Sequence, residues 1–164
     1  MWNLTSGWVV VLLITALGCR EPSLFAQAVE ARQRVTSLEL QFARAVSASQ
    51  HAVMADDARV SASVEEAEAL RVQVVRDGEE LRQLLVHAEF EPETLLLARF
   101  QGSFTAYQLL DRNILGLAHE KSNLQAQRAM ALTLAEKRAL TEACEQALHS
   151  LKVALAKRVA PVDR

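Results

Sequence analysis

Glycine and proline are scarce in this sequence, with five and three occurrences in 164 residues, and aromatic residues make up only 5%. So few turn-forming residues leave little material for a sandwich or barrel of short strands. No run of alternating valine, isoleucine and threonine between turn residues predicts a strand. Alanine, leucine, arginine, glutamate and glutamine, all good helix formers, dominate instead. The composition therefore predicts an all-α protein.

An excess of charge of one sign is also missing. Eighteen basic residues are spread among twenty acidic ones, and the formal net charge is −2. Without a basic stripe, nothing points to a nucleic-acid partner. The two cysteines, Cys19 and Cys144, form no metal-type pair, and Cys144 falls among apolar residues as a small buried side chain would.

Four histidines are the remaining candidates for a metal or haem site: His51, His87, His119 and His149. None of them has a glutamate three positions earlier, which the di-iron motif of helix bundles requires. The sequence contains no nucleophile-elbow motif and no glycine-rich phosphate loop. We therefore expect no metal, no cofactor and no enzymatic activity.

The N-terminus carries an uncharged apolar run, WVVVLLITAL at residues 8–17. This run is too short to span a bilayer, which takes about 20 residues, but it fits the apolar region of a signal peptide. The segment from Ala16 to Cys19 resembles a bacterial lipobox, in which the chain is cut before a cysteine that is then lipidated. We expect residues 1–18 to be a lipoprotein signal peptide and Cys19 to be the lipidation site. An uncleaved anchor and a freely secreted protein are the alternatives, and all three imply export.

The rest of the chain, residues 19–164, is organised by apolar residues that recur at alternating spacings of three and four. That is the pattern of a helix packed among other helices. The pattern loses its register between about residues 55 and 63, Pro92 suits the first turn of a helix, and Ser122 begins a capping-box pattern. These breaks predict helices at about 22–54, 58–88, 92–119 and 123–158.

Short connections between four such helices predict an antiparallel up-down-up-down four-helix bundle. A single helix from Pro22 to Ala88 is the alternative for the first half, and the change of register argues against it. The predicted core consists of the seam residues of the four helices: Leu24, Ala28, Ala31, Val35, Leu38, Phe42, Ala45, Ser49 and Ala52; Val60, Val64, Ala67, Val74, Leu81, Leu85 and Ala88; Phe100, Phe104, Tyr107, Leu110, Ile114 and Leu117; and Ala126, Met130, Thr133, Leu140, Cys144, Ala147 and Leu151.

Two charged residues, Arg71 and Lys137, fall where strict continuation of the seams points inward. One interpretation is that they line a charged pocket between helices for an anionic ligand. The other, which we favour, is that both long side chains reach out from the edge of the seam while Leu70 or Leu140 fills the core.

Other residues also allow two interpretations. Asn113 and Thr133 either set the register of the helices or contact a ligand. Gly78 either permits close approach of a neighbouring helix or is a tolerated surface glycine, at about 1 kcal/mol relative to alanine. For the aromatic residues of the third helix we favour core packing over a pocket wall.

The third and fourth predicted helices resemble the four-helix-bundle sensory module of methyl-accepting chemotaxis receptors. The residues that carry the resemblance are Phe104-x-x-Tyr107, Ile114-Leu115-x-Leu117-Ala118, the turn at Ser122-Asn123, and Ala126, Ala129 and Leu132. The resemblance implies a module that projects from a membrane, binds a small molecule or a partner protein, and takes part in signal transduction.

The sequence departs from that family because no second membrane span follows Leu155 and no signalling region is present. We therefore expect a stand-alone, membrane-tethered sensory module on the extracytoplasmic side of the cell envelope, in the periplasm, that pairs with a second copy or a partner protein. No shared motif marks its ligand-binding residues. The alternative is a structural or adaptor lipoprotein of the envelope without a small-molecule site.

Overall fold

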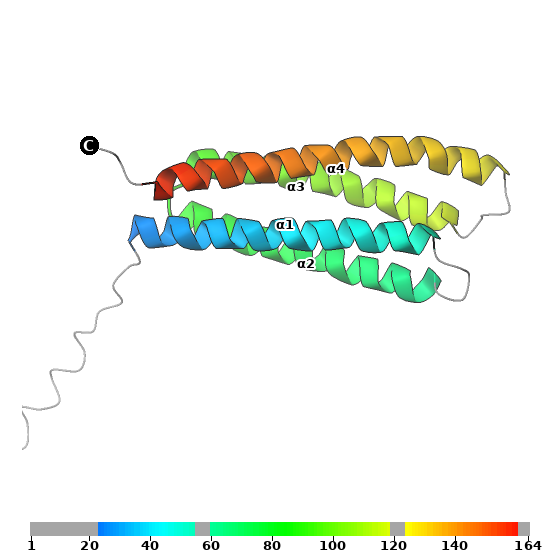
Figure 1. Ribbon diagram of the computed structural model, residues 1–164, viewed down its shortest axis with the longest axis horizontal. Coiled ribbons are helices and arrows are strands. Elements are labelled where there is room, and N and C mark those ends of the chain that lie inside the picture. The colour runs from blue at the N-terminus through cyan, green and yellow to red at the C-terminus, as the bar shows by residue number, and fades with distance from the viewer. Residues whose placement is uncertain (1–22, 55–59, 119–123, 161–164) are drawn as a thin grey trace, which may run out of the picture.

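The computed structural model describes residues 23–54, 60–118 and 124–160. Helices account for nearly all of them: α1 Leu24–Met54, α2 Val60–His87, α3 Glu91–Ala118 and α4 Leu124–Val159. The helices lie lengthwise in an elongated bundle (Figure 1), in which α1 packs against α2 and α4, and α3 packs against α4 and α2. The prediction of an all-α four-helix bundle is therefore confirmed.

The described helices begin and end within two residues of the bounds predicted from the sequence. Because α1 ends at Met54 and α2 begins at Val60 and runs back alongside it, the alternative of one continuous helix is excluded. The export segment with Cys19, the cap at Ser122 and the histidine at position 119 lie outside the described residues. Within those residues, no helix is both long and apolar enough to cross a membrane.

The two ends of the bundle differ in what they contain. The start of α1, the α2–α3 connection and the end of α4 meet at one end, here called the terminal end (Figure 1). The end of α1, the start of α2, the end of α3 and the start of α4 lie at the opposite end, here called the far end. This alternation of direction follows from the short connections, since a chain that reverses after each helix places every second helix end together.

The connection at the terminal end is tight and shaped by hydrogen bonds. The N–H of Phe90 donates to the carbonyl of Leu85 at 2.9 Å, and the N–H of Glu89 donates to the carbonyl of Val86 at 3.1 Å. These two bonds close α2 in a Schellman motif, which places one residue in the left-handed conformation. That residue is Glu89, with φ of 56°. Pro92 then occupies the second position of α3, where its missing N–H is harmless.

An ion pair joins two helices at this same end. The guanidinium of Arg158, near the end of α4, donates to both carboxylate oxygens of Glu93 in the first turn of α3, at 2.6 and 2.8 Å. Burial would raise the pKa of Glu93, but the hydrogen bonds from Arg158 and from the backbone lower it overall. The guanidinium carbon also lies 4.2 Å from the ring centre of Phe90. The start of α3 and the end of α4 are thus held together where their helix dipoles favour opposite charges.

Aromatic side chains fill the middle of the core. Phe100, Phe104 and Tyr107 stack along α3 with ring centres 5.7 and 5.8 Å apart. Phe42 of α1 meets all three of them edge-on, with ring centres 5.7 to 5.9 Å apart. Offset and edge-to-face contacts of this kind are the arrangements that aromatic rings favour. The core-packing interpretation of the three α3 aromatics is confirmed, because none of them is more than 3% exposed.

Most of the predicted seam of α1 is buried, but its first member is not. Ala28 and the seam residues after it are at most 2% exposed, whereas Leu24 is 67% exposed. Leu24 is the first residue of α1, and the packed seam begins one turn later. In α3 the prediction of Leu110 as a core residue is wrong, since Leu110 is only partly buried and its neighbour Asp111 is fully buried.

Gly78 fits neither of the two interpretations of its role. It is buried in α2, so it is not a surface glycine. A Cβ at this position would meet only the amide nitrogen of Gln101, at 3.7 Å, which is an ordinary van der Waals contact. The neighbouring helix therefore does not require a glycine here.

We predict that Gly78→Ala raises the free energy of unfolding by about 1 kcal/mol, because alanine is the better helix former and space for its methyl group exists. Urea unfolding followed by circular dichroism at 222 nm measures this directly. A loss of stability of similar size would show that α2 and α3 are too close together at Gly78 to accept a methyl group.

Candidate ligand-binding site

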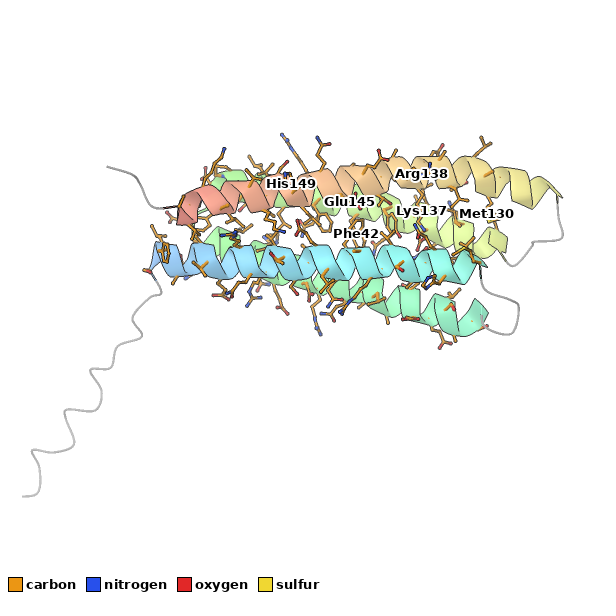
Figure 2. All side chains as sticks on the ribbon, in the orientation of Figure 1. Phe42, Met130, Lys137, Arg138, Glu145 and His149 are labelled. Atoms are coloured by element: carbon orange, nitrogen blue, oxygen red, sulfur yellow. The ribbon has the colours of Figure 1, made fainter. Side chains whose placement is uncertain are left out.

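A cluster of polar side chains is buried in the half of the bundle nearest the far end. Each helix supplies one member: Ser49 from α1, Arg71 from α2, Asp111 from α3 and Lys137 from α4. Their exposed fractions are 0%, 2%, 0% and 5%. Figure 2 shows Lys137 between α4 and α1, in the interior of the bundle. These four residues are called the buried polar cluster below.

The sequence places all four residues inside because each occupies a seam position of its helix. Their neighbours at spacings of three and four are mostly apolar and buried or partly buried: Ala45 and Ala52 on α1, Ala67 and Val74 on α2, Tyr107 and Ile114 on α3, and Thr133 and Leu140 on α4. A helix that buries those neighbours must also bury the polar residue between them. The cluster is therefore a consequence of the heptad pattern.

Asp111 is the centre of the cluster. One of its carboxylate oxygens accepts a hydrogen bond from Nη1 of Arg71, and the other accepts from Nζ of Lys137 and from the hydroxyl of Ser49. Lys137 also donates to the hydroxyl oxygen of Ser49 at 2.6 Å. Two buried basic side chains thus share one buried carboxylate.

A second carboxylate reaches this cluster from the surface. One oxygen of Glu68 contacts Nη2 of Arg71, and its other oxygen lies 3.5 Å from Nη2 of Arg112. The side chains of Glu68 and Arg112 are 44% and 61% exposed, so both lie at the boundary with solvent. Within the described residues, Nε of Arg71 is buried and has no hydrogen-bond partner. The guanidinium of Arg71 is therefore only partly used.

A groove between α2 and α3 leads to Arg71 from outside. Its volume is about 490 Å³, which is within the usual range for small-molecule sites. The residues that line it come from both helices: Val64, Glu65, Glu68 and Arg71 on α2, and Arg112, Leu115 and Gly116 on α3. Arg71 belongs both to this lining and to the buried polar cluster, so the groove connects the cluster to solvent.

Two titratable groups in the core, the Tyr107 hydroxyl and the Cys144 thiol, have raised pKa values. Burial, together with the negative charge of Asp111, raises the pKa of Tyr107, whose hydroxyl has no hydrogen-bond partner among the described residues. The ring of Tyr107 also lies 5.1 Å from Nζ of Lys137. Burial raises the pKa of the Cys144 thiol to about 12. Both groups are therefore neutral at physiological pH, and the Cys144 thiol is a poor nucleophile.

The favoured interpretation of Arg71 and Lys137 is wrong, since neither side chain reaches out from the seam edge. Each turns inward because Asp111 provides a buried partner, which sequence reasoning missed. The missed signal is the unbroken 3–4 spacing of residues 97, 100, 104, 107, 111 and 114, which passes through Asp111 and not through Leu110. Thr133 donates its hydroxyl hydrogen to the carbonyl of Ala129 in its own helix.

None of the three histidines that the structure describes belongs to this site. His51, His87 and His149 are exposed and lie on three different helices. In the part of the chain that the structure describes, no three histidine, cysteine or acidic side chains converge as metal ligands would. The exposed position of Asn113 also places it away from the buried polar cluster.

The geometry of the cluster does not present Ser49 as a nucleophile. A serine hydroxyl beside a lysine amine is a pair that some enzymes use as nucleophile and base. Here, however, Ser49 is fully buried and its hydroxyl donates to Asp111, so its oxygen is not presented to a substrate. What the site offers to a molecule in the groove is the partly used guanidinium of Arg71.

Comparison of the chain with protein-family models, with curated proteins and with solved structures finds no match. The resemblance to chemoreceptor sensory modules therefore remains a prediction from the sequence.

We predict that Asp111→Asn lowers the free energy of unfolding by about 3–5 kcal/mol, because it leaves two buried cations without their common counter-charge. The substitution conserves size, so packing is little changed. Urea unfolding monitored at 222 nm gives the difference.

Glu79→Gln is the matched control. Glu79 pairs with Arg82 three positions later on α2, on the exposed surface, and exposed ion pairs contribute little to stability. Equal effects of the two substitutions would contradict the central place of Asp111.

Proposed function

We propose that this protein is a membrane-tethered, extracytoplasmic sensory module of signal transduction that binds a small molecule in the groove between α2 and α3. The observation that carries the proposal is a buried charge cluster of which one member, Arg71, also lines a groove that is open to solvent. An interhelical site with a few converging polar groups is the usual form of a ligand site in a helix bundle.

The cluster also provides a way to pass on a binding event. Arg71 contacts Asp111, and Asp111 contacts Ser49 and Lys137, so the four helices are linked by direct hydrogen bonds. A ligand that alters the contacts of Arg71 changes the balance of this network. Buried ionic groups with two alternative arrangements are suitable elements for such a switch.

The position of the site suits a tethered module. Ser49 is 25 residues beyond Leu24 along α1, which at 1.5 Å per residue is about 38 Å. If Cys19 is lipidated, the terminal end faces the membrane and the groove lies on the half of the bundle that points away from it. A solute in the envelope then reaches the groove without crossing the headgroup region.

An adaptor function is the second candidate, and a different observation favours it. Several large apolar side chains of α3 and α4 are exposed, and a partner protein or a second copy of the chain would cover them. These are Leu95, Leu109, Leu132 and Leu134, with exposed fractions of 66%, 62%, 74% and 40%.

A thermal-unfolding screen of the full chain in detergent separates the two candidates. The panel contains amino acids, organic acids, aromatic compounds and metal ions. For the sensory function we expect at least one saturable shift, because a ligand at 100 times its dissociation constant adds about 2.7 kcal/mol of stability. A cooperative melt that no compound moves would contradict ligand binding and favour the adaptor.

A further inference from the structure

The guanidinium of Arg71 has an unused edge. Nε and Nη2 of an arginine lie on the same side of the planar group and together can bind both oxygens of one carboxylate. Here Nη1 is taken by Asp111, Nη2 contacts a single oxygen of Glu68, and Nε has no partner among the described residues. Only 2% of Arg71 is exposed, so a hydrogen bond to bulk solvent does not replace the missing one at Nε.

Glu68 pairs with Arg71 through only one of its two carboxylate oxygens. It divides its two oxygens between Arg71 and Arg112, the latter at 3.5 Å, and its side chain is 44% exposed. Glu68 can turn out into water, where its charge is solvated, if an incoming carboxylate takes over its pairing with the buried Arg71. Another carboxylate that engaged both Nε and Nη2 of Arg71 would make a better pair than Glu68 makes.

Besides the charged residues Glu65, Glu68, Arg71 and Arg112, the groove is lined by apolar residues and is open. Val64 and Leu115 form its walls from α2 and α3. Gly116 lies in the same lining, and a Cβ added to it would meet no atom within 4 Å. The space therefore accepts an aliphatic chain attached to a carboxylate, and burial of that chain against the two walls adds a hydrophobic contribution.

We propose that the groove between α2 and α3 binds an aliphatic monocarboxylate, whose carboxylate displaces Glu68 from Arg71 and Arg112 while its chain packs against Val64 and Leu115. This inference rests on the proposed function and specifies the ligand class for its site. Occupancy replaces the single contact of Glu68 with a bidentate pair.

Hexanoate is the probe, and hexanamide is its uncharged counterpart of nearly equal size. Titration calorimetry with the full chain should show saturable binding of hexanoate and at least tenfold weaker binding of hexanamide. Equal binding of the two would overturn the inference, because the arginine would then play no part. Absence of hexanoate binding, when other compounds of the panel do shift the melting temperature, would overturn it and leave the proposed function intact.

Variants of the ion pairs test the displacement of Glu68. Glu68→Gln removes the competing charge and should tighten hexanoate binding at least tenfold, whereas Arg112→Ala should weaken it. Glu79→Gln is the control, because Glu79 pairs with Arg82 at the same spacing on the same helix but away from the groove. Equal affinities of the two glutamate variants would contradict the displacement.

A pair of glycine variants tests the location without changing any charge. Gly116→Leu places a side chain in the groove and should abolish hexanoate binding. Gly102→Leu introduces the same residue in the same helix, where a Cβ likewise meets no atom within 4 Å, and should leave binding unchanged. Both variants replace glycine by a better helix former, so folding is not expected to suffer. Undiminished binding by Gly116→Leu would place the ligand elsewhere and overturn the inference.

Discussion

A single carboxylate, that of Asp111, makes the interior of this bundle possible. Arg71 and Lys137 enter the core from two other helices, and a buried cation without a partner is among the most destabilising features a protein can contain. Because Asp111 accepts hydrogen bonds from both cations and from Ser49, three costly groups become one connected network. The relative positions of the four helices at this level are constrained by that network.

The two halves of the bundle are therefore held together by different forces. Towards the terminal end, the core is apolar and is closed by the ion pair of Glu93 with Arg158. Towards the far end, a polar or charged residue takes the place of an apolar one at one inward position of each of the four helices. Apolar side chains at those positions would give a bundle of equal or greater stability, since desolvation of buried ions offsets much of their attraction. Stability alone therefore does not account for the charged core, and this observation motivates the proposal of a binding site at Arg71.

Much of this architecture follows from the sequence. The 3–4 spacing of apolar residues, the loss of register after Met54 and the proline at position 92 predict four helices and their bounds closely. The site was only half predictable. Arg71 and Lys137 are visible as charged residues at inward positions, but whether they turn inward depends on a partner 26 to 40 residues away in sequence. Asp111 was not predicted as a core residue because its neighbour Leu110 is apolar, and an apolar residue is normally assigned to the core before a charged one. The contact of Glu68 with Arg71 and the unpaired Nε of that arginine could be found only from the three-dimensional structure.

The measurement that tests this account most directly replaces the whole buried polar cluster by apolar residues of similar size: Ser49→Ala, Arg71→Met, Asp111→Leu and Lys137→Met in one chain. The account predicts a cooperative helical melt with stability equal to or about 1–4 kcal/mol above that of the original chain. It also predicts complete loss of every ligand-induced shift that the original chain shows. A variant that unfolds or loses several kcal/mol would show that the cluster is structural, and a stable variant that still binds would show that the ligand does not use Arg71.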